Sequence, residues 1–547
     1  MRKKITFIFI LIFLTGTFCL KTKKSAFDFS TGGVGLFSFF YGYLYGFQIN
    51  AVTVPPSITS ASILPDVTVT FSSNLLASSA TNNSVKLFDK NGTQITTTMS
   101  VSGNTLKVSA NSMLSFSSIY TLSLTTQLSD SSGRTLSSNY STSFTTDTGT
   151  DHFLRSSSLN IDGTTPLGYI ISSRVYPTTD KLYFAWAEKA DATLGNIAFL
   201  HVKSIDKNKS VSLIGTNLNY DGSKSADGPS MSSIDNTLYL AWRENVEIRV
   251  KSFNGSSWTS SDSGSLTSVP TPIATDRPYL HTFNGKLYCI FGEEISTGAR
   301  LVRIKELNGT TWSFIDGGLL NSKNPTSTDG AGYKPVLITY NNILYAAWME
   351  KNQSTGGLDV RIKKYNGSNS WSFIDNGGIQ YNNGMSTNAD ISPYLVTLVS
   401  NNNKLYSFWI EDISGSSRQI RGKVFNGNDT SPSWTSIDNG SSLSYGGANS
   451  LTYALTSISH NNRVFILWQE FTSGVVQLRL ATFSGEDSAP RWFFVDSNPT
   501  TDKGLTFNTT KSAAQGSMGS FNGNLYIGWS EQFSGNEYNA YVSRMAF

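Results

Sequence analysis

The sequence predicts an all-β protein in which a β-sandwich is followed by a seven-bladed β-propeller. Its 547 residues suffice for more than one hydrophobic core. Only 15% of the residues are charged, and short apolar runs alternate with turns rich in Ser, Thr, Asn and Gly. This composition favours short strands over helices. Two observations separate the parts: a strict alternation of apolar and polar residues before residue 148, and a motif that recurs seven times after it.

The amino terminus is typical of an export signal. A positive start, MRKK, precedes the apolar stretch 5–18, which is too short for a comfortable membrane span. The stretch ends in LTGTFC, which resembles a lipobox, so we interpret residues 1–19 as a signal peptide with Cys19 as the lipidated residue. Ordinary signal-peptide cleavage is the alternative. A lipid anchor at Cys19 predicts a location in the cell envelope, at the outer membrane or the cell surface.

The net charge of +4 arises at this terminus. Six of the 42 basic residues lie within the first 24 positions, which leaves 36 basic residues against 38 acidic ones. This balance predicts no nucleic-acid partner.

Residues 20–52 are predicted to form a tether. The stretch GGVGLFSFFYGYLYGFQI is uncharged and rich in Phe, Tyr and Gly. Aromatic side chains of this kind suit a membrane interface, and the membrane is the expected partner beside a lipidated cysteine. The alternatives are that the stretch packs on the following domain or is a second apolar segment of marginal spanning length.

Residues 53–148 show the alternation of half-buried strands. The runs VTVTF, SVKLFD, TLKVSA, YTLSLTTQL and STSFTTD follow one another, with NG, SGN and SSG turns between them. The order of these segments resembles the bacterial Ig-like domain of S-layer proteins and of spirochaetal surface lipoproteins of the leptospiral type. The resemblance implies a spacer or adhesive module without catalytic residues.

Residues 151–547 carry a repeat of 49 to 61 residues. Its copies are LYFAWAE, LYLAWRE, LYCIFGE, LYAAWME, LYSFWIE, VFILWQE and LYIGWSE, which begin at Leu182, Leu238, Leu287, Leu344, Leu405, Val464 and Leu525. Four strands fit in each unit, which is typical of the blades of a propeller.

The ring is predicted to close through its first residues. An Asp near the end of each unit recurs at Asp221, Asp262, Asp316, Asp375, Asp438 and Asp496. The seventh copy stands at Asp162, in SSSLNIDG, before any unit has begun. We therefore expect a strand around Asp162 to pair with the last blade at the carboxyl terminus, which removes an open sheet edge.

Three residue types recur within the blades. Six tryptophans lie in the W-x-E strand and five begin the outer strand, where they are expected to act as wedges between blades. Each Glu of the motif is expected to face an Arg of the next strand, either as an ion pair that fixes the hairpin or as part of a sugar pocket. The candidates are Glu244, Arg249, Glu293, Arg303, Glu350, Arg361, Glu411, Arg421, Glu470 and Arg479.

Two further resemblances bear on function. The repeats are similar to those of fucose-binding lectin propellers, although the order of Arg and Glu is reversed and the units are longer. SIDNG at 436–440 has the core of the sialidase Asp box, but its aromatic residue, Trp434, precedes the Ser. We therefore expect this Asp to cap a turn.

The sequence shows no short catalytic motif. The four histidines have no metal-ligand spacing, and neither GxSxG nor HExxH occurs. We therefore expect no metal or cofactor and a protein that is not an enzyme: an adhesin-like envelope protein that recognises a carbohydrate or a host protein. Long polar links between blades, such as 321–334, either bind this ligand or are solvated connectors. The alternatives are a sialidase-like glycan hydrolase, which requires acids and Arg clustered on one face of the channel, and a purely structural protein.

Overall fold

A computed structural model gives the fold of residues 46–146 and 154–545. Short gaps lie at 56, 60, 62, 112–113, 116–117, 156–158, 162–169, 190–196, 327–328, 352–356, 376–384, 387–391, 413–416, 439, 441, 445, 447–450, 473, 486, 489, 497–503, 507–509 and 535–536. The predicted signal peptide, Cys19 and most of the tether lie outside the described residues. Within these residues, no helix has the length and apolar character needed to cross a membrane. The chain divides into two compact units, Met1–Thr148 and Gly149–Phe547.

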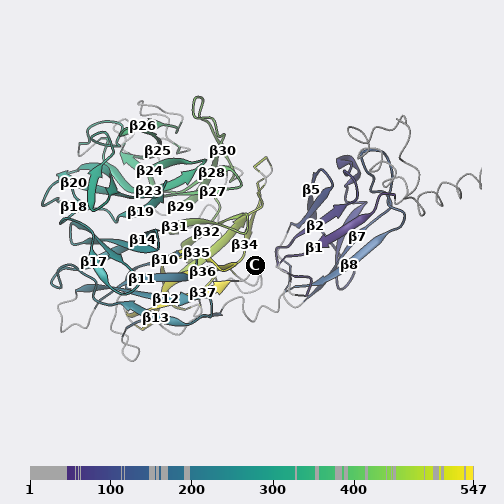
Figure 1. Ribbon diagram of the computed structural model, residues 1–547, viewed down its shortest axis with the longest axis horizontal. Helices are drawn as coiled ribbons and strands as arrows, with labels where there is room; N and C mark the ends of the chain where they lie inside the picture. The colour runs from purple at the N-terminus through teal and green to yellow at the C-terminus, as the bar shows by residue number, and fades with distance from the viewer. Residues whose placement is uncertain are drawn as a thin grey trace, which may run out of the picture. The chain divides into compact units, whose positions relative to one another are not determined.

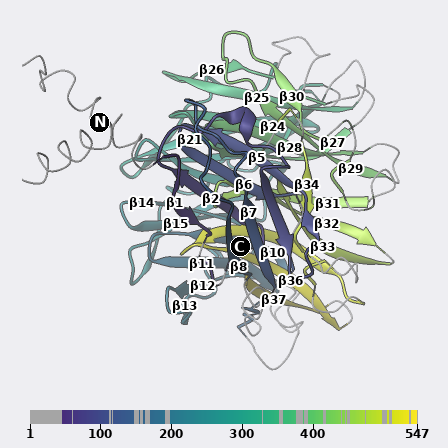
Figure 2. The same ribbon diagram turned by 90° about the vertical axis from the view of Figure 1, so that its right-hand side faces the viewer.

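The first unit is a sandwich of two antiparallel sheets (Figure 1, purple and blue; Figure 2). One sheet has the order β1-β2-β6-β5 and the other β4-β3-β7-β8. The elements are β1 (Ile49–Thr53), β2 (Asp66–Phe71), η1 (Ala77–Ser79), β3 (Val85–Asp89), β4 (Gln94–Ile95), β5 (Thr97–Ser102), β6 (Thr105–Ala110), β7 (Ile119–Leu124) and β8 (Tyr140–Thr145).

Alternate residues of these strands fill the core of the sandwich. In β2, Val67, Val69 and Phe71 are buried while their neighbours are half-buried, as a period of two requires. Phe47 is buried and stacks on Phe71 with 4.9 Å between ring centroids. Residues 47–52, which the sequence analysis assigned to the tether, therefore join the sandwich through Phe47 and β1.

The second unit consists of antiparallel meanders, most of four strands, numbered here 1 to 7 within the described residues; a parallel pairing of Arg418 with Leu451 joins meanders 5 and 6 into one sheet. Meander 1 contains β10 (Ile170–Pro177), β11 (Lys181–Lys189), β12 (Ala198–Asp206) and β13 (Val211–Gly215); meander 2 contains β14 (Ala226–Ile234), β15 (Thr237–Glu244), β16 (Glu247–Phe253) and β17 (Trp258–Ser260). Meander 3 contains β18 (Ala274–Thr275) and β19 (Tyr279–Phe283), which share the innermost position, then β20 (Lys286–Ser296), β21 (Ala299–Asn308) and β22 (Thr311–Phe314). Meander 4 contains β23 (Gly332–Tyr340), β24 (Ile343–Lys351), β25 (Leu358–Gly367) and β26 (Ser370–Phe373).

The last three meanders follow the same plan. Meander 5 contains β27 (Ser392–Asn401), β28 (Lys404–Asp412), β29 (Arg418–Phe425) and β30 (Trp434–Ser436); meander 6 contains β31 (Leu451–His460), β32 (Arg463–Thr472), β33 (Val475–Phe483) and β34 (Trp492–Phe494). Meander 7 contains β35 (Ala513–Phe521), β36 (Asn524–Ser534), β37 (Glu537–Met545) and β9 (Leu154–Arg155). The predicted all-β fold class, a sandwich followed by a propeller, is confirmed.

The outermost strand of meander 7 comes from the start of the second unit. Leu154 and Arg155 of β9 pair with Arg544 and Ser543 of β37. The contact continues at Leu159, whose N–H donates to the carbonyl of Ala540 at 2.9 Å. Asp162, around which the sequence analysis placed this pairing, lies outside the described residues.

Asn160 gives a test of this pairing. Its amide oxygen accepts the Ala540 N–H at 2.8 Å and its amide nitrogen donates to the Tyr538 carbonyl at 3.2 Å. We expect Asn160→Ala to lower the free energy of unfolding by about 1 to 3 kcal/mol, because it leaves a buried N–H without its partner. Urea unfolding measures this. Asn208→Ala, in an exposed turn, is the control and should stay within about 0.5 kcal/mol of the parent.

Candidate functional site

The repeated Trp and Glu side chains form the joints between meanders. The Trp indole N–H donates to the Glu two residues later, at 2.8 Å in Trp242–Glu244 and in four other copies and at 3.2 Å in Trp529–Glu531. The same Glu accepts hydrogen bonds from the link that precedes its meander: Glu244 takes the N–H groups of Tyr220 and Asp221 at 2.8 and 2.7 Å. These carboxylates are buried, so their contacts fix the links and face no solvent.

The repeated Arg side chains bind the outer-strand Asp of their own meander. The closest distances are 2.9 Å for Arg249–Asp262, 2.6 Å for Arg303–Asp316, 2.6 Å for Arg361–Asp375, 3.0 Å for Arg421–Asp438 and 2.6 Å for Arg479–Asp496. The approach of Arg to the Glu of the motif is longer, 3.9 Å for Arg361–Glu350 and 3.8 Å for Arg421–Glu411. The ten repeated residues thus lie together inside the meanders, with contacts that suit a structural role.

Two more repeated contacts were not anticipated from the sequence. In several meanders a Lys follows the Arg by two residues and contacts the preceding meander. Lys363 is an example, because its Nζ donates a hydrogen bond to the Leu320 carbonyl at 2.6 Å. The outer-strand tryptophans do the same, and Trp371 Nε1 donates to the Ile315 carbonyl at 2.9 Å. Each tryptophan therefore fixes a neighbour by a hydrogen bond as well as by its bulk.

Asp221 does not occupy the place of the Arg-bound acids. In meander 1 the Arg is replaced by His201, whose Nδ1 lies 3.0 Å from the Thr216 hydroxyl, so Thr216 takes the place of the acid. Asp221 and Asp162 instead share a Leu-Asn pair that stands two residues before each of them. Leu159 and Leu218 donate their N–H groups to the third strand of their own meanders, and Asn160 and Asn219 bridge the same strands.

Three histidines, of which His201 and His460 are buried and His281 is half-buried, make the stability of this unit depend on pH. Burial lowers the pKa of His201, His281 and His460 to about 4 in each case. Below pH 6.5 the unfolded chain takes up protons that the folded protein does not, so stability is complete above pH 6.5 and falls as the pH drops toward 4. The free energy of unfolding should fall by about 2 kcal/mol for each histidine when the pH is lowered from 7 to 5.

The measurement is urea unfolding followed by tryptophan fluorescence at pH 7 and pH 5, since all eleven tryptophans lie in the second unit. Burial raises the pKa of Asp496 to about 6, which acts in the opposite direction, so a variant must isolate the histidine. His460→Asn should lose less stability than the parent protein on the same change of pH. An identical loss would contradict the assignment.

A channel of about 930 Å³ runs along the inner strands of the second unit. It is lined by residues of β10, β14, β19, β23, β27, β31 and β35, one strand from each meander. These strands surround the middle of the unit in Figure 1. Two sets of connections lie at the same end of the channel. They are the links that lead into the inner strands and the hairpins that join the second strands to the third. We call this end the channel mouth.

Irregular backbone shapes the channel mouth. The pairing of inner and second strands is interrupted at Gly228 and Pro229, at Lys334 and Pro335, and between β18 and β19 at Arg277 and Pro278. Proline is tolerated there because the bulge removes the ladder hydrogen bond. Lys334 has a φ of 48°, a strained value for a residue with a side chain. The residues at all three interruptions line the channel.

The first acidic group of the channel mouth is Asp227. Its Oδ2 accepts from Arg243 Nη2 at 2.7 Å and from Arg277 Nε at 3.1 Å, and its Oδ1 lies 3.0 Å from Arg277 Nη2. Arg277 continues across the channel, where its Nη1 donates to Gln515 Oε1 of meander 7 at 3.1 Å. The Arg277 side chain is 43% exposed, so its guanidinium group is both held in place and accessible.

The second acidic group is Asp276, which holds the same register in meander 3 as Asp227 in meander 2. Its Oδ1 accepts from Arg300 Nη1 at 2.8 Å and its Oδ2 from the Lys334 N–H at 2.9 Å. The Arg300 Nε also donates to Glu294 at 3.1 Å. Two carboxylates from neighbouring inner strands therefore face the channel beside three guanidinium groups.

Two glycines allow this arrangement. A Cβ atom at Gly228 would lie 2.2 Å from the Arg277 Cγ, and one at Gly292 would lie 2.5 Å from the Asp276 Oδ2. Gly228 also has a φ of 64°, which favours glycine by itself. None of these channel residues was predicted from the sequence. Their signals were the triplets Asp-Gly-Pro at 227–229 and Asp-Arg-Pro at 276–278, and the glycine of LYCIFGE at a place where the other six copies hold a side chain.

The cations of the channel mouth affect one another. Burial lowers the pKa of Lys334; Asp276 opposes this effect, while Arg277, Arg418 and Arg300 add to it. Arg418 lies over the ring of Tyr453 and Arg300 over that of Tyr333, at 5.2 and 5.1 Å from the ring centroids. The channel mouth is therefore a polar site with aromatic walls. No group of three or more His, Cys, Asp or Glu residues suited to a metal ion occurs among the described residues.

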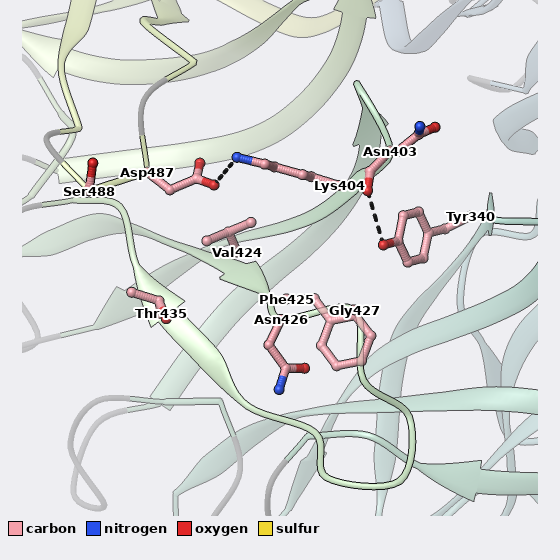
Figure 3. A pocket seen from close by; sticks show the side chains of 10 residues that line it. All are labelled: Tyr340, Asn403, Lys404, Val424, Phe425, Asn426, Gly427, Thr435, Asp487 and Ser488. Atoms are coloured by element: carbon pink, nitrogen blue, oxygen red, sulfur yellow. Dashed lines mark hydrogen bonds and ion pairs between the residues drawn. The ribbon is translucent and has the colours of Figure 1, made fainter.

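A smaller cavity of about 550 Å³ lies among meanders 4, 5 and 6 (Figure 3). Phe425 and Tyr340 line it, and the Lys404 ammonium group pairs with Asp487 across it. Its residues come from the turns between first and second strands and between third and fourth strands, at the end of the meanders away from the channel mouth. It contains one acid, already paired with a lysine, so the channel mouth is the stronger candidate site.

Comparisons with known proteins gave matches of two kinds. Residues 47–146 match the family of the bacterial Ig-like domain. A comparison with curated proteins gave no match. Among solved structures, the α-L-arabinanase of Penicillium chrysogenum is 13% identical, with 59% of this chain and 93% of the other covered and a TM-score of 0.38. The polysaccharide lyase Uly1 is 9% identical, with 69% and 90% covered and a TM-score of 0.45. The Trypanosoma rangeli sialidase is 12% identical, with 69% and 55% covered and a TM-score of 0.36.

These likenesses correct one expectation. The absence of short catalytic motifs led to the prediction that the protein is not an enzyme. The solved structures to which the chain is similar include glycoside hydrolases and a polysaccharide lyase, so the prediction that the protein is not an enzyme is withdrawn. At these identities the likeness is one of fold. The reason for the error is physical: a channel assembles its polar groups from several strands, so a site needs no contiguous motif.

Proposed function

We propose that the channel mouth of the second unit binds and cleaves a glycan. The observation that carries the proposal is the presence of Asp227 and Asp276 at matching positions of neighbouring inner strands, beside Arg277. A glycan-cleaving enzyme of this fold is expected to cluster acids and Arg on one face of its channel. Hydrolysis of a glycosidic bond commonly uses two carboxyl groups, one to protonate the leaving oxygen and one to act as base or nucleophile.

The other groups suit recognition of a sugar. Arg277 and Gln515 present hydrogen-bonding groups inside the channel, and Tyr279 and Tyr453 offer flat apolar faces. Adhesion without cleavage is the second candidate, since both carboxylates already hold guanidinium groups. Anchorage in the cell envelope through Cys19 and binding of a host protein stay predictions.

The test is a panel of neutral and acidic polysaccharides incubated with the purified protein. Release of new reducing ends from at least one polymer supports the proposal. Binding on a glycan array without release would support adhesion, and neither binding nor release would contradict both candidates.

Gly292 supplies a sharper test of the geometry. We expect Gly292→Ala to lower the rate of cleavage at least tenfold, because the added Cβ displaces the Asp276 carboxylate. Gly222→Ala is the matched control, since a Cβ there meets nothing within 4 Å. Equal rates for the two variants would exclude Asp276 from the site.

A further inference from the structure

The charges that line the channel are unbalanced. Its lining contains four cationic side chains and two carboxylates, a surplus of two positive charges. The carboxylates are Asp227 and Asp276, and the cations are Arg174, Arg243, Arg277 and Lys334. Both carboxylates already bind guanidinium groups, Asp227 those of Arg243 and Arg277 and Asp276 that of Arg300. A negatively charged ligand would complement this surplus.

Three of the cations come from different meanders and face the same space. Arg277 extends across the channel to Gln515, and Lys334 occupies the corresponding bulge of meander 4. Arg174, from β10, lies over the ring of Tyr279 at 5.1 Å from its centroid. Among the described residues, no carboxylate lies within ion-pair distance of Arg174. Burial lowers the pKa of Lys334; Asp276 opposes this effect, and the neighbouring guanidinium groups add to it.

We infer that the ligand carries an oxyanion, either the carboxylate of a uronate or the ester of a sulfated sugar, and that Arg174, Arg277 and Lys334 hold it. This inference rests on the proposed function and names the class of its substrate. The planar fork of Arg277 matches a carboxylate or a sulfate group, and Lys334 supplies a compact charge beside it. Tyr279, with Arg174 stacked on it, would contact the sugar ring.

The experiment is calorimetric titration of the full protein with matched pairs of hexasaccharides. One set pairs uronate hexamers with the same hexamers after reduction of the carboxyl groups, and the other pairs sulfated hexamers with their unsulfated parents. We expect at least one charged member to bind at least tenfold more tightly than its neutral counterpart, with an affinity that falls as salt is added. The set in which this occurs identifies the source of the oxyanion.

Variants locate the charge that is responsible. Lys334→Met and Arg174→Met should each weaken binding of the charged hexamer about tenfold and leave that of its neutral counterpart within about twofold. Lys286→Met is the control, because this lysine lies away from the channel in an exposed pair with Glu306. Equal or tighter binding of the neutral members would overturn this inference and leave the proposed function standing. Binding of no member of either set, with no cleavage of any polymer, would overturn both.

Discussion

Asp227→Asn and Asp276→Asn will each reduce cleavage of the glycan substrate by about 100-fold or more and leave the fold intact. Loss of a general acid or base commonly lowers a rate by about 10² to 10⁴. Asparagine keeps the size of the side chain and an acceptor for the guanidinium groups of Arg243, Arg277 and Arg300, so the cluster should stay assembled. Rates of reducing-end release under saturating polymer measure the effect, and near-ultraviolet circular dichroism verifies the fold.

Asp429→Asn is the matched control for these two variants. Asp429 is also a partly buried, ion-paired Asp, bound to Lys364 at 2.8 Å, but its position is remote from the channel. Its rate should stay within about twofold of the parent. A loss of activity in the control equal to that of the channel variants, or full activity in both channel variants, would remove Asp227 and Asp276 from the reaction.

Arg479→Met will lower the free energy of unfolding of the second unit by about 3 to 5 kcal/mol. Arg479 and Asp496 are both fully buried, with Nε and Oδ2 2.6 Å apart. Removal of the guanidinium group leaves the carboxylate buried with backbone N–H donors, among them that of Leu480 at 2.9 Å, in place of a full countercharge. Urea unfolding at pH 8 measures the loss, and Lys207→Met, in an exposed pair, should change stability by less than about 1 kcal/mol.

The dependence on pH gives this second prediction its own check. Burial raises the pKa of Asp496 to about 6 even with Arg479 present, and loss of the arginine should raise the pKa further. The folded variant then keeps a proton that the unfolded chain loses above pH 3.8, so its deficit should shrink as the pH falls from 8 to 5. The double variant Arg479→Met, Asp496→Asn should recover most of the lost stability. A deficit independent of pH would contradict the buried ion pair.

The repeated residues account for the features of the fold that could be predicted from the sequence. Apolar alternation runs through the first unit, and the W-x-E motif recurs in six of the seven repeats, with Phe291 replacing Trp in the third, so they predicted the sandwich, the propeller and the wedge tryptophans. The partner of each Arg was harder to assign, because Glu350 and Asp375 both lie on the same side of the sheet as Arg361. Only the three-dimensional distances, 3.9 Å to Glu350 and 2.6 Å to Asp375, separate the two.

The candidate site escaped prediction for a different reason. Asp227, Asp276 and Arg277 are each unlike the corresponding residues of most other units, and a search for what repeats passes over them. Their proximity depends on the bulges at Gly228 and at Arg277–Pro278, which turn single residues toward the channel. Arg277 and Gln515 are 238 residues apart in sequence, and only the circular arrangement of the inner strands brings them into contact.

The crystal structure of the Asp227→Asn variant with the oligosaccharide that it fails to cleave would test the central claim most directly. The account predicts the sugar inside the channel mouth, with an oxygen atom hydrogen-bonded to Arg277 and a ring against Tyr279. A sugar bound only between meanders, in the cavity of Figure 3 beside Lys404 and Asp487, or only on the first unit would contradict it.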